Sequence, residues 1–249
     1  MSGKNLQSKV AVVTGGTRGI GRAIAARLLA EGAQVAICGM RQNSVDGALD
    51  LLSPRDAVFG MVADVSKLED VRSFVGAVQK RFGAIHILVN NAGAGLFRSV
   101  AELTPEEWQR TIGLNLTGVY YCCHEILPIF RQGGGGDVVN ISSLAGKNAF
   151  AGGAAYNASK FGLNGFSEAM MLDYRNAGVR VSTIMPGSVD TEFGGGHSTS
   201  PEREGNSDKN AWKIAPEDIA DIVVNVLRMP RRTTVSAVEV RPSRPPGKA

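Results

Sequence analysis

Cysteine is scarce in this sequence, and its spacing fits neither disulfides nor zinc. The 249 residues contain three cysteines, Cys38, Cys122 and Cys123, an odd number without a CxxC pair. A disulfide framework is therefore not expected, a reducing compartment is indicated, and the adjacent pair is predicted to pack in the core. The three histidines are scattered without an HExxH pattern, so no metal site is predicted, and His86 is interpreted as a strand residue.

Long apolar runs are also missing. No run approaches the roughly 18 residues that a membrane-spanning helix needs. The opening stretch, MSGKNLQSK, lacks the apolar segment of a secretory signal. These absences predict a soluble, cytoplasmic protein without a membrane partner.

The basic charge is confined to one end of the chain. Lysine and arginine number 27 against 23 acidic residues, which gives a net charge of +4. The last stretch sets Glu239 against six basic residues: Arg228, Arg231, Arg232, Arg241, Arg244 and Lys248. A near-neutral body with a basic tail is not the broad positive face of a nucleic-acid binder. We expect a solvated C-terminal tail and no nucleic-acid partner; a binding tail is the alternative.

Glycine, by contrast, is abundant, and short apolar runs alternate with helical patterns. The 31 glycines exceed the roughly 17 that an average share of about 7% would give, which predicts tight turns and close backbone approaches. Apolar, β-branched runs predict strands at 10–14, 34–38, 58–62, 85–89, 138–141, 179–185 and 235–240. Helical spacing predicts helices at 19–31, 45–52, 68–82, 155–176 and 216–227, and one long helix opening at Thr104. The whole chain, 1–249, is therefore predicted to be a single α/β domain, a Rossmann-type doubly wound fold with a seven-stranded parallel sheet.

Two segments depart from this alternation. Residues 194–212 are rich in glycine, serine and charge, and we expect a flexible substrate loop or lid there. Gly133–Gly136 leads into a strand, not a helix, so it is interpreted as a turn.

A glycine-rich loop lies between the first predicted strand and the first predicted helix. Thr14–Gly21 reads TGGTRGIG, with the spacing GxxxGxG. Backbone N–H groups and the helix dipole favour negative charge at such a junction, so a dinucleotide pyrophosphate is the expected ligand. The alternative is an ordinary glycine-rich turn.

The end of the second predicted strand indicates which dinucleotide binds. NAD sites place a carboxylate there to bind the ribose 2′-hydroxyl, but this sequence has Gly39. Arg41 follows it, and Arg18 lies in the glycine loop. Two guanidinium groups near a 2′-phosphate favour NADP as the cofactor.

Tyr156 and Lys160 stand four residues apart, on one face of a predicted helix. A free phenol has a pKa of about 10, and a nearby ammonium is expected to lower it toward neutrality, where it serves as a general acid or base. Ser143 follows the fifth strand, at the edge where α/β folds bind ligands, and its hydroxyl can donate to a carbonyl. Asparagine is a poor helix former, yet Asn115 lies within the predicted long helix. Its side-chain amide is therefore expected to have a role in the site.

These residues together resemble the short-chain dehydrogenase/reductase family. TGxxxGxG, NNAG at 90–93, Asn115, Ser143, Tyr156, Lys160 and PG at 186–187 occur in the family's order over nearly the whole chain. The resemblance implies that Tyr156 is the general acid/base, that Lys160 lowers its pKa and holds the nicotinamide ribose, and that Ser143 polarises the carbonyl. Asn115 would hold a water that relays protons. The activity implied is NADP-dependent interconversion of a carbonyl and an alcohol.

The resemblance also implies the rest of the cofactor site. Asp64 and Val65 would flank the adenine, Asn90 and Gly93 would line the cleft, and Val189 and Thr191 would touch the carboxamide. The complete expected cofactor set is Gly15, Thr17, Arg18, Gly19, Ile20, Gly21, Arg41, Asp64, Val65, Asn90, Asn91, Ala92, Gly93, Tyr156, Lys160, Pro186, Gly187, Val189 and Thr191.

Four questions stay open. A catalytically silent NADP-binding sensor or scaffold is an alternative, although it has no need of all four polar residues. Reduction of 3-oxoacyl groups on an acyl carrier protein is a narrower alternative, which the Arg-Pro tail and the Gly133–Gly136 turn do not favour. A family member is expected to form a homodimer or homotetramer, an expectation that the unusual tail weakens. The apolar residues Leu96, Phe97, Phe150 and Phe193 either line a substrate pocket or pack in the core.

Overall fold

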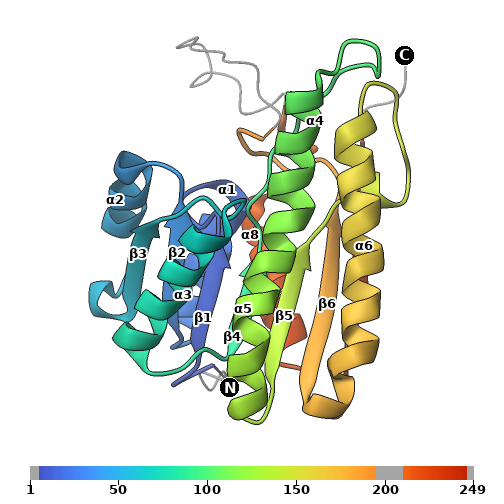
Figure 1. Cartoon of the computed structure of the whole chain (residues 1–249). Helices are drawn as coiled ribbons and strands as arrows, with labels where there is room; N and C mark the ends of the chain where they lie inside the picture. The colour runs from blue at the N-terminus through green and yellow to red at the C-terminus, as the bar shows by residue number, and fades with distance from the viewer. Residues whose placement is uncertain (1–5, 194–209, 246–249) are drawn as a thin grey trace.

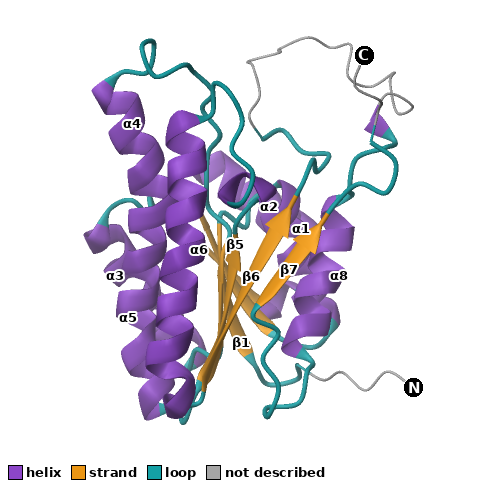
Figure 2. Ribbon diagram, turned by 90° about the vertical axis from the view of Figure 1, so that its right-hand side faces the viewer, coloured by secondary structure: helices purple, strands orange, loops and turns teal. Residues whose placement is uncertain are grey.

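The computed structural model describes residues 6–193 and 210–245 as a twisted parallel sheet with helices on both faces (Figures 1 and 2). The strands are β1 (Val10–Thr14), β2 (Gln34–Gly39), β3 (Val58–Val62), β4 (Ile87–Asn90), β5 (Gly136–Ile141), β6 (Val179–Pro186) and β7 (Ala237–Val240). Their order is β3-β2-β1-β4-β5-β6-β7, and every neighbouring pair is parallel. The predicted seven-stranded Rossmann-type sheet is confirmed.

The order of the strands indicates where along the sheet a ligand is expected to bind. Connections run outward in one direction through β2 and β3, and in the other through β4 to β7. Between β1 and β4 the direction reverses, and in folds of this kind ligands bind at the carboxyl ends of the strands beside that reversal. The glycine loop follows β1, and Asn90 ends β4.

Helices cover both faces (Figure 2). One face carries α1 (Gly19–Ala30), α2 (Gln42–Leu51) and α8 (Pro216–Leu227), and the other carries α3 (Leu68–Phe82), α5 (Gly118–Gln132) and α6 (Ala154–Tyr174). Alternate strand residues divide between the two layers: Ala11 and Val13 pack with α1 and α8, whereas Val10 and Val12 pack with α3 and α5. Because both faces are buried, the strands are almost continuously apolar.

Local signals explain most helix boundaries. Thr104 caps α4 (Pro105–Ile112) with a reciprocal pair of bonds: Glu107 N donates to its hydroxyl, and its own N–H donates to the Glu107 carboxylate. Gly83, with φ of 80°, ends α3 in a left-handed conformation that glycine adopts without strain. The long helix predicted to open at Thr104 is present. It contains one irregularity that the sequence did not predict, because a π-helical turn at Gly113–Thr117 joins α4 to α5.

The described part of the basic C-terminal stretch is largely exposed at its arginines, including Arg232, Arg241 and Arg244. Two arginines nevertheless bind the body of the domain: Arg228 pairs with Glu31, and Arg231 pairs with Asp137. Arg241 pairs with Glu239 within the stretch itself. The predicted last strand is present at residues 237–240, as the edge strand β7 beside β6.

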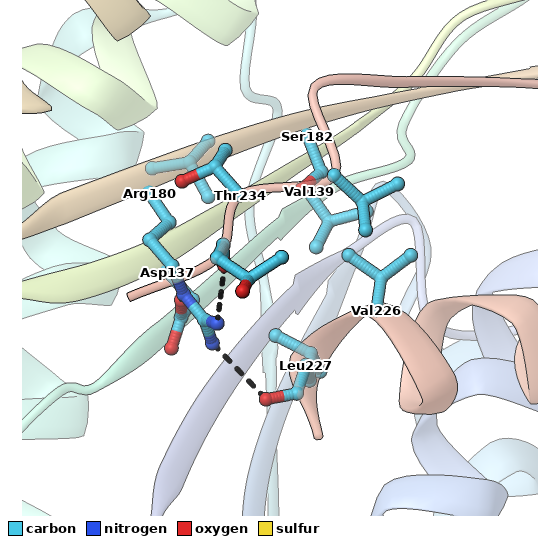
Figure 3. Close-up of a pocket in the computed structure, with 10 residues that line it drawn as sticks. Asp137, Val139, Arg180, Ser182, Val226, Leu227 and Thr234 are labelled. Carbon is cyan, nitrogen blue, oxygen red and sulfur yellow. Dashed lines mark hydrogen bonds and ion pairs between the residues drawn. The ribbon is translucent and has the colours of Figure 1, made fainter. Parts of the chain in front are cut away.

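A buried arginine holds the end of α8 against the sheet (Figure 3). Arg180, at the start of β6, pairs with Asp137 of β5 at 2.6 Å. Its guanidinium also donates to the carbonyl oxygens of Leu227, Met229 and Thr233, at 3.0, 2.7 and 3.1 Å. The last carbonyls of a helix have no partner within it, and a cation there satisfies them.

Two further predictions concern the cysteines and the loop at 194–212. The free thiols of all three cysteines are buried, and burial raises the pKa values of Cys38 and Cys123 to about 12, which confirms their packing role. The expected loop at 194–212 lies outside the described residues except for its last three, 210–212. Within the described ranges, no helix is long and apolar enough to cross a membrane.

Candidate active site

The glycine loop has the geometry that a phosphate approach requires. Gly15 and Gly19 have φ of 62° and 51°, which side chains rarely tolerate. A Cβ at Gly21 would lie 2.3 Å from the Gly15 carbonyl oxygen, so α1 packs directly on the loop. Helix α1 begins at Gly19 with no acidic residue in its first turn. The N–H groups of Gly19, Ile20 and Gly21 are thus in the unpartnered first turn of a helix, where an anion is stabilised.

Asn91 fastens this loop to the end of β4. Its side-chain nitrogen donates to the carbonyl oxygens of Thr14 and Gly15, at 3.0 and 3.1 Å. In return, the Thr14 hydroxyl accepts from the backbone N–H groups of Asn91 and Ala92. The two strand ends on either side of the sheet reversal are therefore held as one rigid unit.

The segment after β6 closes on the same loop. A Cβ at Gly19 would lie 3.3 Å from the Thr191 methyl group, so these segments are in near contact. Arg18 and Glu192 form an ion pair of 2.6 Å in which both side chains are 69% exposed. Val189 forms an isolated β-bridge with Ile214, which fixes the chain just before Thr191. Pro186 and Gly187 continue from β6, and the Gly187 N–H donates to Val240.

The end of β2 is shaped by Thr17. A Cβ at Gly39 would lie 2.6 Å from the Thr17 methyl group, so only glycine fits beneath this side chain. Arg41 follows as an exposed residue at the start of α2, and no hydrogen bond or ion pair of its side chain occurs within the described residues. The two guanidiniums expected to bind a 2′-phosphate thus differ: Arg18 already has an acidic partner, and Arg41 has none in the described ranges.

Three expected cofactor residues have other partners in the structure. Asp64 accepts from the Ser66 N–H and hydroxyl, which forms a turn after β3. Val65 is 4% exposed and belongs to the core beneath α5. Asn90 is 2% exposed, and its nitrogen donates to the Asn140 side chain at 2.8 Å, inside the sheet rather than into the cleft. Gly93 lies against Asn115, whose oxygen would be 3.1 Å from an added Cβ.

The end of β5 presents two serines with different surroundings. Ser142 is 5% exposed and donates to Asn164 at 2.6 Å. Ser143 is half-buried; its hydroxyl accepts from the Ala145 N–H at 3.1 Å and lies close enough to Tyr156 to act on its pKa. Of the two, Ser143 is the hydroxyl beside Tyr156, as the sequence predicted.

Tyr156 and Lys160 lie together in the first turns of α6. The Lys160 ammonium is 5.8 Å from the centre of the Tyr156 ring and donates to the Ile141 carbonyl oxygen at 3.0 Å. Burial lowers the pKa of Lys160 to about 8. The expected lowering of the Tyr156 pKa is wrong for this structure: burial raises the pKa of the phenol above its usual value, although the Ser143 hydroxyl opposes the rise.

Asn115 lies at the irregular turn of the long helix. It lies in the π-helical turn, is fully buried, and brackets Ala94 by accepting from its N–H at 2.9 Å and donating to its carbonyl at 3.0 Å. It also donates to the Ser159 hydroxyl at 3.1 Å, and Ser159 donates to the Tyr156 carbonyl oxygen. A π-helical turn places one extra residue in the helix, and such turns are frequent at functional sites. Here it turns the amide toward the start of α6.

An open hollow lies on the other side of the sheet from this site. A space of about 590 Å³ at the opposite, amino edge of the sheet is lined by residues including Lys9, His86, Gly134 and Arg228. His86 precedes β4, and its Nδ1 accepts from the Val10 N–H at 3.0 Å, so its ring serves the sheet edge. Among the described residues, no three His, Cys, Asp or Glu side chains are grouped to hold a metal ion.

Residues 9–201 match the family model described as short chain dehydrogenase. This stretch covers well over half of the chain. The chain belongs to the short-chain dehydrogenase family.

Relatives and solved structures agree with this assignment. A 3alpha-hydroxysteroid dehydrogenase of Mediterraneibacter gnavus is 36% identical over 191 residues, which is 76% of each chain. A metagenomic short-chain oxidoreductase solved with NADP is 33% identical, covers 97% of this chain and 100% of its own, and has a TM-score of 0.82. An alcohol dehydrogenase from the archaeon Thermococcus sibiricus, solved with 5-hydroxy-NADP, is 30% identical with coverage of 96% and 99% and a TM-score of 0.84.

Sequence reasoning missed several residues of this short-chain dehydrogenase site. Ser159 links Asn115 to Tyr156. Asn140 accepts a hydrogen bond from the Asn90 side-chain nitrogen and donates one to the Ser167 hydroxyl, both at 2.8 Å. Asn140 is a polar residue within an apolar stretch, a signal that was present in the sequence, whereas Ser159 lies among other polar residues. Glu192 was also missed, because an ion pair between residues 174 positions apart has no local signature.

Proposed function

We propose that this protein is an NADP-dependent oxidoreductase that interconverts a carbonyl and an alcohol by hydride transfer. One observation carries the proposal: Tyr156, Lys160 and Ser143 lie together at the carboxyl edge of the sheet, beside a glycine loop that is shaped for a dinucleotide. The names of the two dehydrogenase relatives support the same reaction class.

The loop's own geometry fits the cofactor. Side chains at Gly15, Gly19 or Gly21 would fill the space over the start of α1 or strain the backbone, so the loop keeps its N–H groups accessible to a pyrophosphate. When bound, the nicotinamide supplies the hydride that reduces a carbonyl carbon. Thr191 and Val189 lie on the segment that faces the loop, where they would contact the carboxamide.

The chain's residues then handle the proton. Ser143 donates to the carbonyl oxygen and polarises it, and Tyr156 gives that oxygen its proton. Lys160 stays charged below a pKa of about 8 and favours the phenolate that is left behind. Asn115 forms hydrogen bonds with Ala94 and Ser159. It thereby fixes the position of the first turns of α6, which carry Tyr156 and Lys160.

NADP, rather than NAD, is favoured by the end of β2. Gly39 leaves no carboxylate to repel a 2′-phosphate, and Arg41 and Arg18 offer two guanidiniums nearby. The Arg41→Asp variant is expected to shift the preference toward NADH. If preference for NADPH survives unchanged, the 2′-phosphate is bound elsewhere.

The reaction is tested with the Tyr156→Phe variant. NADPH oxidation is followed with a panel of ketones, aldehydes, keto-sugars and 3-oxoacyl thioesters, and NADPH binding is measured separately by fluorescence. We expect turnover to be lost while binding is kept. Retained turnover would remove Tyr156 from the mechanism. NADPH binding without turnover on any member of the panel would favour the silent sensor.

A further inference from the structure

Three phenylalanines surround the hydroxyl-bearing ring of Tyr156. Phe97 follows β4, Phe150 precedes α6, and Phe193 follows β6, so each comes from a different loop at the carboxyl edge. Ring centres lie 5.6 Å from Tyr156 for Phe97, 6.5 Å for Phe150 and 5.7 Å for Phe193. Phe97 and Phe150 also meet edge to face at 5.5 Å. The three rings therefore form one continuous cluster, which we call the aromatic wall.

The aromatic wall is exposed to a similar extent at every member. Phe97, Phe150 and Phe193 are 46%, 44% and 46% exposed, whereas Tyr156 beneath them is 7% exposed. Burial of apolar surface contributes roughly 25 cal/mol of favourable free energy per Å². Leaving three clustered rings half-exposed to water is therefore unfavourable. Exposed apolar clusters beside polar reactive groups are characteristic of binding sites. The core alternative for these residues is therefore wrong.

Glycines set the position of the rings. A Cβ at Gly95 would lie 2.8 Å from the Phe193 ring and 2.9 Å from the Phe97 ring. A Cβ at Gly153 would lie 2.7 Å from the Phe150 ring. Each ring thus rests directly on backbone, which limits its movement and keeps the wall in place beside Tyr156.

The charged side chains of the same loops have polar partners. Four of the five charged residues of the described segments 91–104, 142–153 and 187–193 are in ion pairs: Arg98–Glu107, Lys147–Glu239, Lys213–Asp190 and Arg18–Glu192. The fifth, Glu102, accepts a hydrogen bond from the Ser99 hydroxyl. These segments therefore offer a substrate an aromatic surface and no cation without an acidic partner, so an anionic substrate would lose hydration without gaining an ion pair there.

We infer that the aromatic wall of Phe97, Phe150 and Phe193 selects an uncharged ketone whose carbonyl carbon is part of a hydrocarbon ring, and the corresponding secondary alcohol. The inference rests on the proposed function, because Tyr156 must act on the same carbonyl. Ring faces and edges on three sides match the broad apolar faces of a cyclic molecule. A rigid ring also loses less conformational entropy on binding than an open chain of the same size.

The test compares three ketones with NADPH: cyclohexanone, open-chain 2-hexanone and 4-oxocyclohexanecarboxylate. The carboxylate carries the same ring with a charge, and 2-hexanone carries the same number of carbons without the ring. We expect kcat/KM for cyclohexanone to exceed that of each by at least about tenfold, the scale on which apolar pockets discriminate.

Variants of the wall connect this preference to the three rings. Phe97→Ala and Phe150→Ala are each expected to lower kcat/KM for cyclohexanone by at least about tenfold, mainly by raising KM. The rate with 4-oxocyclohexanecarboxylate should change much less. Phe161→Ala is the matched control, because Phe161 on α6 is also 46% exposed but is not in the wall. NADPH binding, followed by fluorescence, verifies that each variant is folded.

The outcomes separate this inference from the proposed function. If no ketone gives turnover that Tyr156→Phe abolishes, both are overturned. If turnover depends on Tyr156 but the charged or open-chain ketone is used as well as cyclohexanone, only the substrate class is wrong. Wall variants that affect all three ketones equally would likewise overturn the inference and leave the reaction in place.

Discussion

Arg18 in the glycine loop and Glu192 beyond β6 form an ion pair of 2.6 Å between two segments of the proposed cofactor site. The pair occupies a guanidinium that we propose for the 2′-phosphate of NADP, and the Glu192 carboxylate would repel that phosphate. Both side chains are 69% exposed, so the pair itself contributes little to stability.

We predict that Glu192→Gln tightens NADPH binding by roughly fivefold, since an exposed pair is worth at most about 1 kcal/mol. Binding of NADH, which lacks the 2′-phosphate, should not change. Fluorescence titration of both cofactors measures the effect, and Glu168→Gln, an exposed acid on α6, is the control. An equal gain for NADH would mean that Glu192 acts on some other part of the cofactor.

Arg180 is predicted to be a stability residue without a role in turnover. Its side chain is 10% exposed, pairs with Asp137 and holds carbonyls at the end of α8 (Figure 3). Breaking such a buried pair typically costs about 3–5 kcal/mol, because the remaining charge loses its partner. Arg180→Leu should lower the free energy of urea unfolding by about 3 kcal/mol, the lower end here because Arg231 also pairs with Asp137.

The control for this variant is Arg72→Leu, which removes an arginine from exposed ion pairs on α3. It should leave the unfolding midpoint unchanged within error. The rate per folded molecule should also be kept in Arg180→Leu, because Arg180 lies at the amino edge of the sheet. A loss of kcat in the folded variant would contradict the assignment.

Periodicity was enough to predict the sheet. The central strands are buried on both faces, so their apolar runs appear directly in the sequence, as in Val10–Thr14. Helix ends could also be predicted where the capping residue stands next to the helix in the sequence, as at Thr104 and Gly83. Motif positions likewise placed Ser143, Tyr156 and Lys160, which the fold brings together from two elements.

What the sequence did not predict depends on contacts between distant segments. The π-helical turn arises because Asn115 binds Ala94, 21 residues away, and helical propensity contains no such information. The ion pairs of Arg228 and Arg231 could not be predicted, because their acidic partners, Glu31 and Asp137, lie far from them in the sequence. The pKa of Tyr156 was misjudged because spacing shows the nearby ammonium but not the burial that opposes it.

Asn115 is predicted to be a positioning residue for α6. Its amide makes three hydrogen bonds, two to Ala94 and one to Ser159. Asn115→Ala leaves those buried groups unpaired, which costs about 1–3 kcal/mol for each one that stays unsatisfied. Because Ser159 binds the Tyr156 backbone, we also expect kcat to fall by at least about tenfold.

Asn140→Ala separates the two effects. Asn140 is equally buried and bonds to Asn90 and Ser167, but within the described ranges neither partner has a side-chain hydrogen bond to Tyr156 or Lys160. It should lose comparable stability, measured by urea unfolding, while kcat per folded molecule changes little. If both variants lose kcat alike, Asn115 has only a general structural role.

Lys160 is predicted to make stability depend on pH in a specific window. Burial lowers its folded pKa to about 8, whereas an unfolded lysine titrates near its usual value of 10.5. Between these values the unfolded chain holds more protons than the folded one, so stability rises with pH there. From pH 7 to 9.5, this group should add about 2 kcal/mol to the free energy of unfolding, at about 1.36 kcal/mol per pH unit above pH 8.

The effect is isolated by comparing the protein with Lys160→Met at both pH values. The hydrogen bond lost to the Ile141 carbonyl is the same at each pH, so it cancels in the difference. We expect the stability of the parent protein relative to Lys160→Met to rise by about 2 kcal/mol between pH 7 and 9.5. Lys80→Met, on the exposed face of α3, should show no such change. A flat difference for Lys160→Met would mean that the ammonium is not the buried charge on which the Tyr156 mechanism depends.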